Sequence, residues 1–254
     1  MKIHFLGTGT SMGIPMLGCQ CAVCKSSDPK DKRLRTSVWI QKNNCSLIID
    51  AGVDFRQQAL LAGIRRVDAV LFTHHHVDHI FGLDDLRPLG ILQNRAVEIY
   101  ASPETFRNLQ RVYAYLFDEN PAQSDIPRVN WNLIENGCFQ INDDLEVLPI
   151  LLYHGKLPVL GYRIGDFAYC TDVSHIPEES FARLDSLKIL VLGALRHSSH
   201  ATHFNIKQAV EAAQKIGAEQ TWFIHMSHQV AHQQTNEQLP AGIRLAYDGL
   251  EINL

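Results

Sequence analysis

The feature that most constrains this chain is a set of metal-binding side chains placed directly after an apolar segment. Residues 69–72 read as a short buried strand, and a histidine-rich run follows it. His74 and His76 lie two positions apart, so their side chains can converge on one side. Asp78 and His79 begin the next predicted helix and can address a second ion. Imidazole and carboxylate together suit zinc, manganese or iron, with open positions left for water.

Further candidate ligands stand at the ends of other predicted strands. Four side chains are too few for two ions, and the chain offers three more of suitable chemistry, each after an apolar run and at the start of a loop. Ligands in such positions project from a rigid frame into the loops, where sites are usually built. They are His154, Asp172 and His225, after strands predicted at 146–153, 167–170 and 221–224.

Two polar residues near the histidine cluster have less direct expected roles. His75 falls out of the alternation of its neighbours, so we expect it to pack or to support a ligand. Asp50 ends the apolar run 47–49. It can orient a ligand imidazole or cap the turn at Ala51 and Gly52, and both interpretations stand.

Composition limits the classes of protein to which the chain can belong. It has 254 residues, of which 46% are hydrophobic and 20% charged, the balance of an ordinary globular protein, and we predict one continuous domain over residues 1–254. The net charge of −4 disfavours a general nucleic-acid binder, which is usually basic. The apolar runs fall far short of the roughly 20 residues of a membrane span. The N-terminus does not read as a signal peptide, so a cytoplasmic location is expected.

Strand-like segments dominate both halves of the chain, and helix-like segments punctuate them. This order predicts an α/β (α+β) protein with two sheets packed on each other and helices outside. We expect Asp54 to cap the helix that Gly63 ends. The strands are expected at 3–7, 37–41, 45–49, 69–72, 131–134, 139–141, 146–153, 160–164, 167–170, 189–192, 221–224 and 244–253, and the helices at 54–62, 79–93, 103–117, 178–184 and 205–216.

Three of the six cysteines lie close together and indicate a second kind of metal site. Their spacing is C-x-C-x-x-C, in a loop that also holds Gly18, and three thiolates leave a tetrahedral zinc one ligand short. These are Cys19, Cys21 and Cys24. A redox pair is the alternative, although a third cysteine is superfluous for it. The remaining cysteines are expected to be plain buried residues: Cys45, Cys138 and Cys170.

These motifs resemble those of a known group of hydrolases. His74, His76, Asp78 and His79 match the H-x-H-x-D-H motif of the metallo-β-lactamase-fold hydrolases, and the three later candidates follow in the same order. The resemblance narrows to the PhnP-like branch, the phosphoribosyl 1,2-cyclic phosphate phosphodiesterases, through residues 7–15, 18–24, 239–242 and 247–249. It covers the whole chain and implies an αββα sandwich, with two mixed sheets flanked by helices.

The resemblance also implies which residues hold metal. It implies two divalent ions, Mn²⁺ or Zn²⁺, in the active site and one structural Zn²⁺. The first ion would be held by His74, His76 and His154, the second by Asp78, His79 and His225, and Asp172 would bridge them together with a water or hydroxide. The structural zinc would be held by Cys19, Cys21, Cys24 and, as fourth ligand, His228.

A polar segment after the strand at 189–192 supplies candidates for the acid and for substrate contacts. The resemblance places this role on His203, which would protonate the leaving alkoxide or donate a hydrogen bond to the phosphoryl group. Asp78 counts as catalytic as well as a ligand. His200 is the second candidate and a substrate contact, and His197 is expected to be exposed. Asn205 or Thr202 would cap the following helix.

A basic segment lies between residues 25 and 35. It can form a rim for a phosphorylated substrate, although a solvated loop is the preferred interpretation. The residues concerned are Lys25, Lys30, Lys32, Arg33 and Arg35. Arg35 is the best single candidate for a structural role or for binding a phosphate.

The main functional hypothesis is a phosphodiesterase that hydrolyses a small cyclic phosphate or nucleotide-like phosphodiester by attack of a metal-bound hydroxide. One alternative is a tRNA 3′-processing nuclease, which would need an extended basic arm to bind the RNA phosphates. Another is a thioester or lactone hydrolase on the same fold. A non-enzymatic metal-binding module is disfavoured, because a scaffold needs no open coordination positions.

The expected binding partner is a small phosphorylated substrate; neither a membrane nor an extended nucleic acid is expected. Relatives in this branch are often dimers, so the resemblance allows a homodimer, although the sequence identifies no contact face.

Overall fold

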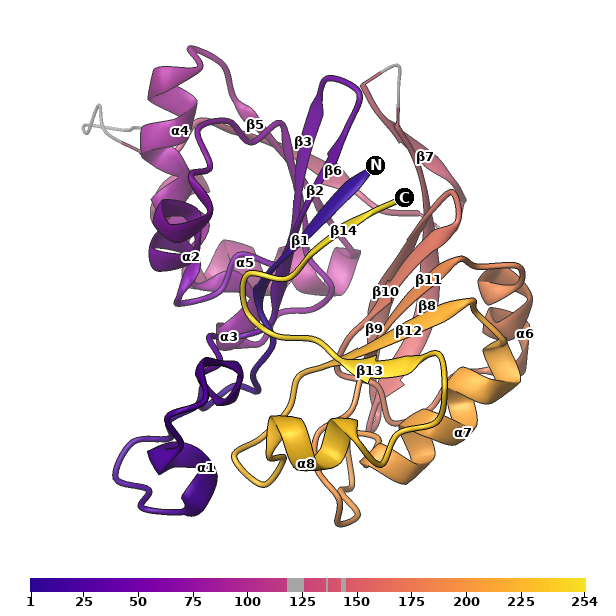
Figure 1. Ribbon diagram of the computed structural model, residues 1–254. Helices are drawn as coiled ribbons and strands as arrows, with labels where there is room; N and C mark the ends of the chain where they lie inside the picture. The colour runs from indigo at the N-terminus through magenta and orange to yellow at the C-terminus, as the bar shows by residue number, and fades with distance from the viewer. Residues whose placement is uncertain (118–125, 136, 143–144) are drawn as a thin grey trace.

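The core of the protein consists of two β-sheets that lie face to face, with helices on their outer sides (Figure 1). The computed structural model describes residues 1–117, 126–135, 137–142 and 145–254. Each sheet has seven strands in this part of the chain. The predicted sandwich of two mixed sheets flanked by helices is confirmed.

The first sheet comes from the first half of the chain, apart from one C-terminal strand. Its spatial order is β14-β1-β2-β3-β4-β5-β6. Strands β14, β1, β2 and β3 pair antiparallel, whereas β3, β4, β5 and β6 run parallel. The bounds are β1 Lys2–Gly7, β2 Ser37–Lys42, β3 Cys45–Ile49, β4 Ala69–Leu71, β5 Val97–Ala101, β6 Val129–Leu133 and β14 Glu251–Asn253.

The second sheet comes from the second half of the chain. Its spatial order is β13-β12-β11-β10-β9-β8-β7. Strands β7 to β10 pair antiparallel, and β10 to β13 run parallel. The bounds are β7 Phe139–Ile141, β8 Leu145–His154, β9 Leu157–Ile164, β10 Phe167–Cys170, β11 Ile189–Gly193, β12 Gln220–Ile224 and β13 Ile243–Leu245.

The helices cover the outer faces of the sandwich. Phe55 of α2 and Leu109 of α5 pack on the first sheet, and Ala209 and Ala212 of α7 pack on the second. Among the helices of the described residues, none has the length and apolar character needed to cross a bilayer. The α-helices are α1 Ala22–Lys25, α2 Phe55–Ala62, α3 Val77–Ile80, α4 Arg87–Leu92, α5 Pro103–Val112, α6 Glu178–Phe181, α7 Ile206–Ile216 and α8 His232–Asn236, and the 3₁₀ turns are Pro29–Asp31, Leu83–Leu86, Ala114–Phe117 and Ala182–Leu184.

The two sheets are held together by a fully buried apolar layer. Val38 and Leu47 of the first sheet belong to one cluster with Val147, Tyr169 and Val191 of the second, and none of the five is exposed to solvent. Burial of a Val or Leu side chain stabilises a fold by about 1.5–3 kcal/mol. This layer therefore fixes how the two sheets lie relative to each other, and so how their loops meet.

Strand direction brings the candidate ligands to one edge of the sandwich. Because β3 and β4 run parallel, as do β10 and β12 on either side of β11, their carboxyl ends share an edge. Asp50 follows β3, Asp172 comes soon after β10, and His225 directly follows β12. His154 is the last residue of β8. Sites in sheets of this kind lie at the carboxyl ends of the strands.

One predicted strand is wrong. The segment 244–253 forms two short strands in different sheets: β13 pairs with β12, and β14 pairs with β1. Between them Gly249 has a φ of 87°, and its N–H donates to the carbonyl of Phe5 at 2.8 Å. Glycine adopts this left-handed conformation without steric cost. The chain therefore turns here from one sheet to the other, a change that an apolar pattern does not reveal.

The predicted helix at 79–93 is also wrong, because it is broken into α3, the turn Leu83–Leu86 and α4. At the first break the N–H of Gly82 donates to the carbonyl of Ala51 at 2.8 Å, and a Cβ at Gly82 would overlap the carbonyl of Gly52. Pro88 lies in the first turn of α4 and has no N–H to continue a helix from the preceding turn. The loop after β3 thus sets the position of α3.

Two smaller predictions are corrected. Asp54 precedes α2, but its carboxylate makes no capping bond and accepts instead from the backbone N–H of Arg35 at 2.8 Å. Gly63 ends the helix as predicted, with a φ of 66°. Cys138 is exposed, whereas Cys45 and Cys170 are buried as expected.

Candidate metal centre

The seven histidines and aspartates expected to bind metal meet at the edge where the two sheets come together. In each of several groups the candidate ligand atoms all lie within 4.8 Å of one another. These groups are His74, His79 and Asp172; His76, His154 and Asp172; Asp78, His79 and His225; and Asp172, His203 and His225, so that His203 also lies within ligand distance. Asp172 is shared between groups, which is the geometry needed of a bridging ligand. Figure 1 shows how α3 and the ends of β10 and β12 approach this edge.

The backbone turns sharply where the strands reach this edge. Asp50, Asp172 and His225 have φ values of 62°, 48° and 59°, in the left-handed region that residues other than glycine seldom adopt. Such conformations persist only where the surrounding structure enforces them, and they cluster at functional sites. Each one redirects a side chain from the end of a strand into the centre.

A close backbone approach places the ligands of α3. A Cβ on Gly52 would overlap the backbone carbonyl of Asp78. The loop after β3 therefore passes directly against the first turn of α3, and only a glycine at this position permits that contact.

The carboxylate of Asp172 faces imidazoles on both sides. Its Oδ1 lies 3.1 Å from Nδ1 of His225 and 3.4 Å from Nε2 of His79, and its Oδ2 lies 3.8 Å from Nε2 of His74. Nε2 of His79 also lies 3.3 Å from the carboxylate of Asp78. All of these side chains are at least nine-tenths buried.

The far nitrogens of two rings are held by a buried network. Asp50 accepts from Nδ1 of His79 at 2.7 Å and from the hydroxyl of Thr73 at 2.8 Å. Because that hydroxyl donates to Asp50, it accepts from Nδ1 of His74, 3.0 Å away. Asp50 therefore orients a candidate ligand, which was one of its two predicted roles. Partners of this kind fix the tautomer and direction of a ligating imidazole.

Two further rings are held in the same manner. Nδ1 of His154 donates to the carbonyl of Thr202 at 2.6 Å. Nε2 of His225 lies 3.3 Å from the hydroxyl of Thr10. The opposite nitrogen of His225 is left to face Asp172.

The nitrogens that face the centre pass a direct test for metal binding. Nε2 of His74, Nε2 of His79 and Nδ1 of His225 are buried and make no well-directed hydrogen bond among the described residues, although each faces a carboxylate oxygen of Asp172 at 3.1–3.8 Å. A buried polar atom without a partner is costly and rare. A cation ligated by these atoms removes the cost, and imidazole with carboxylate is a donor set that Zn²⁺ and Mn²⁺ accept. The residues therefore fit a divalent metal.

The charges of the site favour a cation. Burial alone would lower the pKa of His79, but the carboxylates of Asp78, Asp172 and Asp50 outweigh it and hold that pKa well above its usual value. Burial likewise opposes ionisation of Asp172, yet His225 and His79 hold its pKa well below the usual range. The carboxylates therefore give this point a negative charge, which stabilises a cation bound there.

His203 lies beside the candidate ligands, as expected of a residue that contacts substrate. Its ring centroid is 4.4 Å from that of His154 and 4.9 Å from that of His225. Burial and the neighbouring His225 lower the pKa of His203 to about 3, so the ring is neutral near pH 7 and carries one N–H. His200, 5.1 Å from His203 between centroids, and His197 are both exposed. Nε2 of His197 lies 3.2 Å from the hydroxyl of Thr235 on α8, away from the ligand groups.

The remaining predicted site residues lie further out. His75 is half-buried beside His76, with ring centroids 5.6 Å apart, and belongs to none of the ligand groups. Arg35 is bound to Asp54 at 3.1 Å and to the carbonyl of Ser11 at 2.9 Å, an arrangement that fits the structural role among its two predicted ones. Asn205 caps α7 through a reciprocal pair of hydrogen bonds with Gln208.

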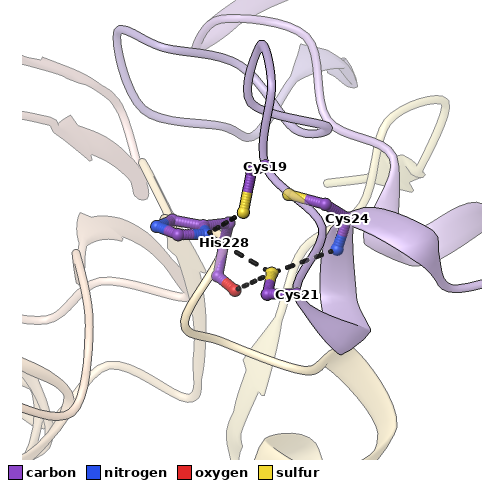
Figure 2. A group of neighbouring side chains, drawn as sticks. All are labelled: Cys19, Cys21, Cys24 and His228. Atoms are coloured by element: carbon purple, nitrogen blue, oxygen red, sulfur yellow. Dashed lines mark hydrogen bonds between the residues drawn. The ribbon is translucent and has the colours of Figure 1, made fainter.

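The cysteine cluster also forms, and His228 joins it (Figure 2). Nδ1 of His228 lies 3.3 Å from the sulfur of Cys19 and 3.4 Å from that of Cys21. A hydrogen bond from the backbone N–H of Cys24, followed by the contact with His228, lowers the pKa of the Cys21 thiol to about 6. Three sulfurs and one imidazole nitrogen lie within 4.8 Å of one another, and Cys₃His is a donor set that structural zinc sites use.

The sequence did not predict the structural roles of two residues, Arg33 and Thr73. Arg33, one of the basic residues of the segment 25–35, is 1% exposed and donates to the carbonyls of Ser227 and Val230. A basic residue among other basic residues reads as solvated, and nothing local in the sequence reveals its burial. Thr73 holds both Asp50 and His74, and its place directly before the first histidine was the available signal.

Comparison with known proteins identifies the family. The profile described as "Beta-lactamase superfamily domain" matches residues 46–226. A crystal structure of a diphosphatase from the PhnP family is 43% identical, covers 99% of this chain and 96% of that one, and superposes with a TM-score of 0.93. Zn²⁺-bound PqqB from Methylobacterium extorquens shares the fold, with 19% identity, a TM-score of 0.79 and full coverage of both chains, 100% each.

Curated relatives are longer than this chain. An octanoyltransferase from Porphyromonas gingivalis is 41% identical over 254 residues, which is 99% of this chain but 51% of the relative. Ribonuclease Z from a Bradyrhizobium strain is 28% identical over 124 residues, 46% of this chain and 41% of the relative. The chain thus spans about half the length of the curated relatives it matches.

These findings define the class of the protein. The chain belongs to the beta-lactamase superfamily and has the metallo-β-lactamase fold. Within that superfamily it belongs to the PhnP-like branch.

Proposed function

We propose that this protein is a metal-dependent hydrolase, a phosphodiesterase that cleaves a small cyclic phosphate or a nucleotide-like phosphodiester and holds two divalent ions, Mn²⁺ or Zn²⁺. The observation that carries the proposal is the position of Asp172, whose two oxygens face different imidazoles of one seven-residue cluster. His76 and His154 form one group with Asp172, and Asp78 forms another with His79 and His225. A paired site of this kind suits in-line displacement at phosphorus.

The two ions, when bound, would polarise the phosphoryl oxygens and activate a water near neutral pH. The chain's own part is to hold the ligands still. Asp50 and Thr73 fix the rings of His79 and His74, and Thr202 fixes His154. Ligands fixed in this way need no rearrangement during the reaction.

His203 serves the substrate. Its neutral ring lies beside His154 and His225, and its N–H can donate to a phosphoryl oxygen as negative charge develops there. Transfer of a proton to the leaving alkoxide would instead require the imidazolium form of the ring, which a bound negatively charged phosphoryl group favours by raising the pKa of His203. His200 lies next to it on the exposed side and would contact the outer part of the substrate.

The relatives support phosphorus as the reacting centre. A PhnP-family diphosphatase and a ribonuclease Z both carry names that refer to hydrolysis of phosphate esters or anhydrides. A net charge of −4 disfavours a long polyanion, since nucleic-acid binders neutralise many phosphates with basic residues. A small phosphorylated substrate fits both observations better than an RNA.

A second candidate is hydrolysis of a thioester. The observation that favours it is the name of the Porphyromonas gingivalis relative, an octanoyltransferase. Because this chain corresponds to 51% of that relative, acyl transfer can reside in the part that has no counterpart here. The same pair of ions can support attack on a carbonyl carbon, so the metal centre alone does not distinguish a thioesterase from a phosphodiesterase.

A substrate panel tests the proposal. The protein loaded with Mn²⁺ or Zn²⁺ is assayed with bis(p-nitrophenyl) phosphate, a ribose cyclic phosphate, a dinucleoside diphosphate, a tRNA precursor and an octanoyl thioester. We expect turnover of the small phosphodiesters to exceed that of the thioester and the RNA, and to be lost on chelation. Faster hydrolysis of the thioester or the tRNA precursor would overturn the proposal.

A further inference from the structure

The two candidate metal sites share one short segment of chain. His225 belongs to the metal centre and His228 to the cysteine site, and only Met226 and Ser227 separate them. The N–H of Met226 donates to the carbonyl of Thr8 at 3.0 Å, and its carbonyl accepts from the N–H of Thr10 at 3.0 Å. A shift of this segment would therefore move a ligand of each site at once.

Arg33 grips the far side of the same segment. Its guanidinium donates to the carbonyl of Ser227 at 3.3 Å and to that of Val230 at 2.9 Å, on either side of His228. Asp31 accepts from the same guanidinium at 3.2 Å and from the backbone N–H of His232 at 2.8 Å. The side chain of Arg33 is 0% exposed. Two carbonyls and one carboxylate thus tie residues 31–33 to residues 227–232.

Burying the guanidinium of Arg33 carries a desolvation cost. Burial is the main cause that lowers the pKa of Arg33, and Asp31 offsets part of it. A buried, partnered charge gives little net stability over an apolar replacement, so it is weak evidence of a purely stabilising role. A planar guanidinium with several N–H donors holds two carbonyl groups in a fixed position relative to each other. The carbonyls concerned bracket a candidate zinc ligand.

The cysteine loop is tied to the same residues from its own side. The backbone of Arg33 pairs with that of Ile14, at 2.8 and 2.9 Å, directly before the loop that carries the cysteines. Lys32 donates to the carbonyl of Cys24 at 3.0 Å. Residues 32 and 33 therefore contact the cysteine loop and the histidine segment together.

We propose that Arg33, oriented by Asp31, is a positioning residue that couples the cysteine site to the metal centre, so that a metal ion in one site raises the affinity of the other. The physical carrier is the segment 225–228, which Arg33 holds in the one arrangement that serves both sites. Coupling between two binding sites is reciprocal by thermodynamic necessity. The proposal requires metal binding at both groups and does not depend on which substrate the centre hydrolyses.

Cobalt titration of the metal-free protein tests the proposal without an activity assay. Co²⁺ bound by thiolates absorbs strongly in the near ultraviolet, whereas Co²⁺ bound by imidazole and carboxylate gives only weak visible bands, so the two sites are read separately. In Arg33→Lys the charge is kept and the fork is lost. We expect the affinity of both sites to fall, each by about tenfold, within the usual range of coupling energies.

A matched control is Arg163→Lys. Arg163 also donates to backbone carbonyls, those of Gly165 and Asp185 at 2.8 Å and that of Arg183 at 2.9 Å, but it lies away from both sites. This variant should unfold at a lower temperature and bind Co²⁺ as the parent does. If Arg33→Lys fails to fold, Asp31→Asn keeps an oxygen acceptor and should lower both affinities by a smaller factor. Parent-like affinities in Arg33→Lys, or a change at one site only, would overturn the proposal.

A double-mutant cycle separates coupling from two independent losses. Cys21→Ser should weaken Co²⁺ binding at the cysteine site and also lower the affinity of the metal centre about fivefold. Adding Arg33→Lys to Cys21→Ser should then cost the centre less than it costs in the parent, since the two act through the same segment. Additive losses at the centre would contradict the coupling.

Discussion

The two candidate metal sites of this protein are built in opposite ways. In the metal centre the ligands come from the segments that follow strands of both sheets and from α3, and four of the rings are held from behind by Asp50, Thr73, Thr202 or Thr10. In the cysteine site three ligands come from one loop and the fourth from residue 228, and most of them are only half-buried. The comparison indicates that the centre is organised by the fold, whereas the cysteine site needs its ion to bring the loop into place.

The largest expected effect comes from removing the carboxylate that both halves of the centre share. In Asp172→Asn the negative charge between the two ions is lost, and we expect turnover to fall by about 10⁴-fold, because metal ions supply several kcal/mol of transition-state stabilisation and each tenfold corresponds to about 1.4 kcal/mol. Metal analysis should show fewer ions per chain. The exposed Asp185, changed to Asn, is the control and should keep full activity. Near-normal turnover in Asp172→Asn would contradict the shared role.

The next effect separates the substrate side of the centre from its metal side. His203→Ala should lower turnover by about 10²–10⁴-fold, the usual range for a proton-transfer or hydrogen-bonding group, with unchanged metal content. His197→Ala, in the same segment but exposed, should behave as the parent. Steady-state kinetics and metal analysis of both variants check this. Unaltered turnover in His203→Ala would remove the residue from the mechanism.

A third prediction concerns how the fold organises the centre. Asp50→Asn keeps the shape of the side chain but weakens its hold on His79 and Thr73, so metal affinity should fall by about 10–100-fold. Asp68→Asn is the control, since Asp68 is an equally buried carboxylate that binds Arg66 and Ser46 instead. It should lower the melting temperature and leave metal affinity unchanged. Equal losses of metal affinity in both variants would show that burial, not orientation, is what matters.

The smallest effect is on stability. Burial raises the pKa of Asp248 to about 7, against about 3.9 in an unfolded chain. Between these values the folded state binds the proton more tightly, so the free energy of unfolding should decrease as pH rises from about 4 to 7. Asp248 accepts from Thr8 and from the N–H of Leu34. In Asp248→Asn the part of this slope that comes from residue 248 should vanish in thermal melts. An identical slope in both proteins would show that the carboxyl ionises freely.

The sequence predicted what local pattern and chemistry determine. The strands Phe139–Ile141 and Phe167–Cys170 have the predicted bounds, and the candidate ligands were found because strand ends with histidine or aspartate are rare by chance. It did not predict that residues 243–245 and 251–253 belong to different sheets, because one turn at Gly249 decides it. Nor did it predict the burial of Arg33, whose partners lie about 200 positions away. Contacts between distant residues leave no mark on a local pattern.

The most direct test of this account is a crystal structure with anomalous scattering recorded at the zinc and manganese edges. The account predicts two ions on either side of Asp172, ligated by the seven histidines and aspartates, and a third, zinc, among Cys19, Cys21, Cys24 and His228. A map in which His154, Asp172 or His225 turns away from the ions, or in which the centre holds no pair of ions, would contradict it.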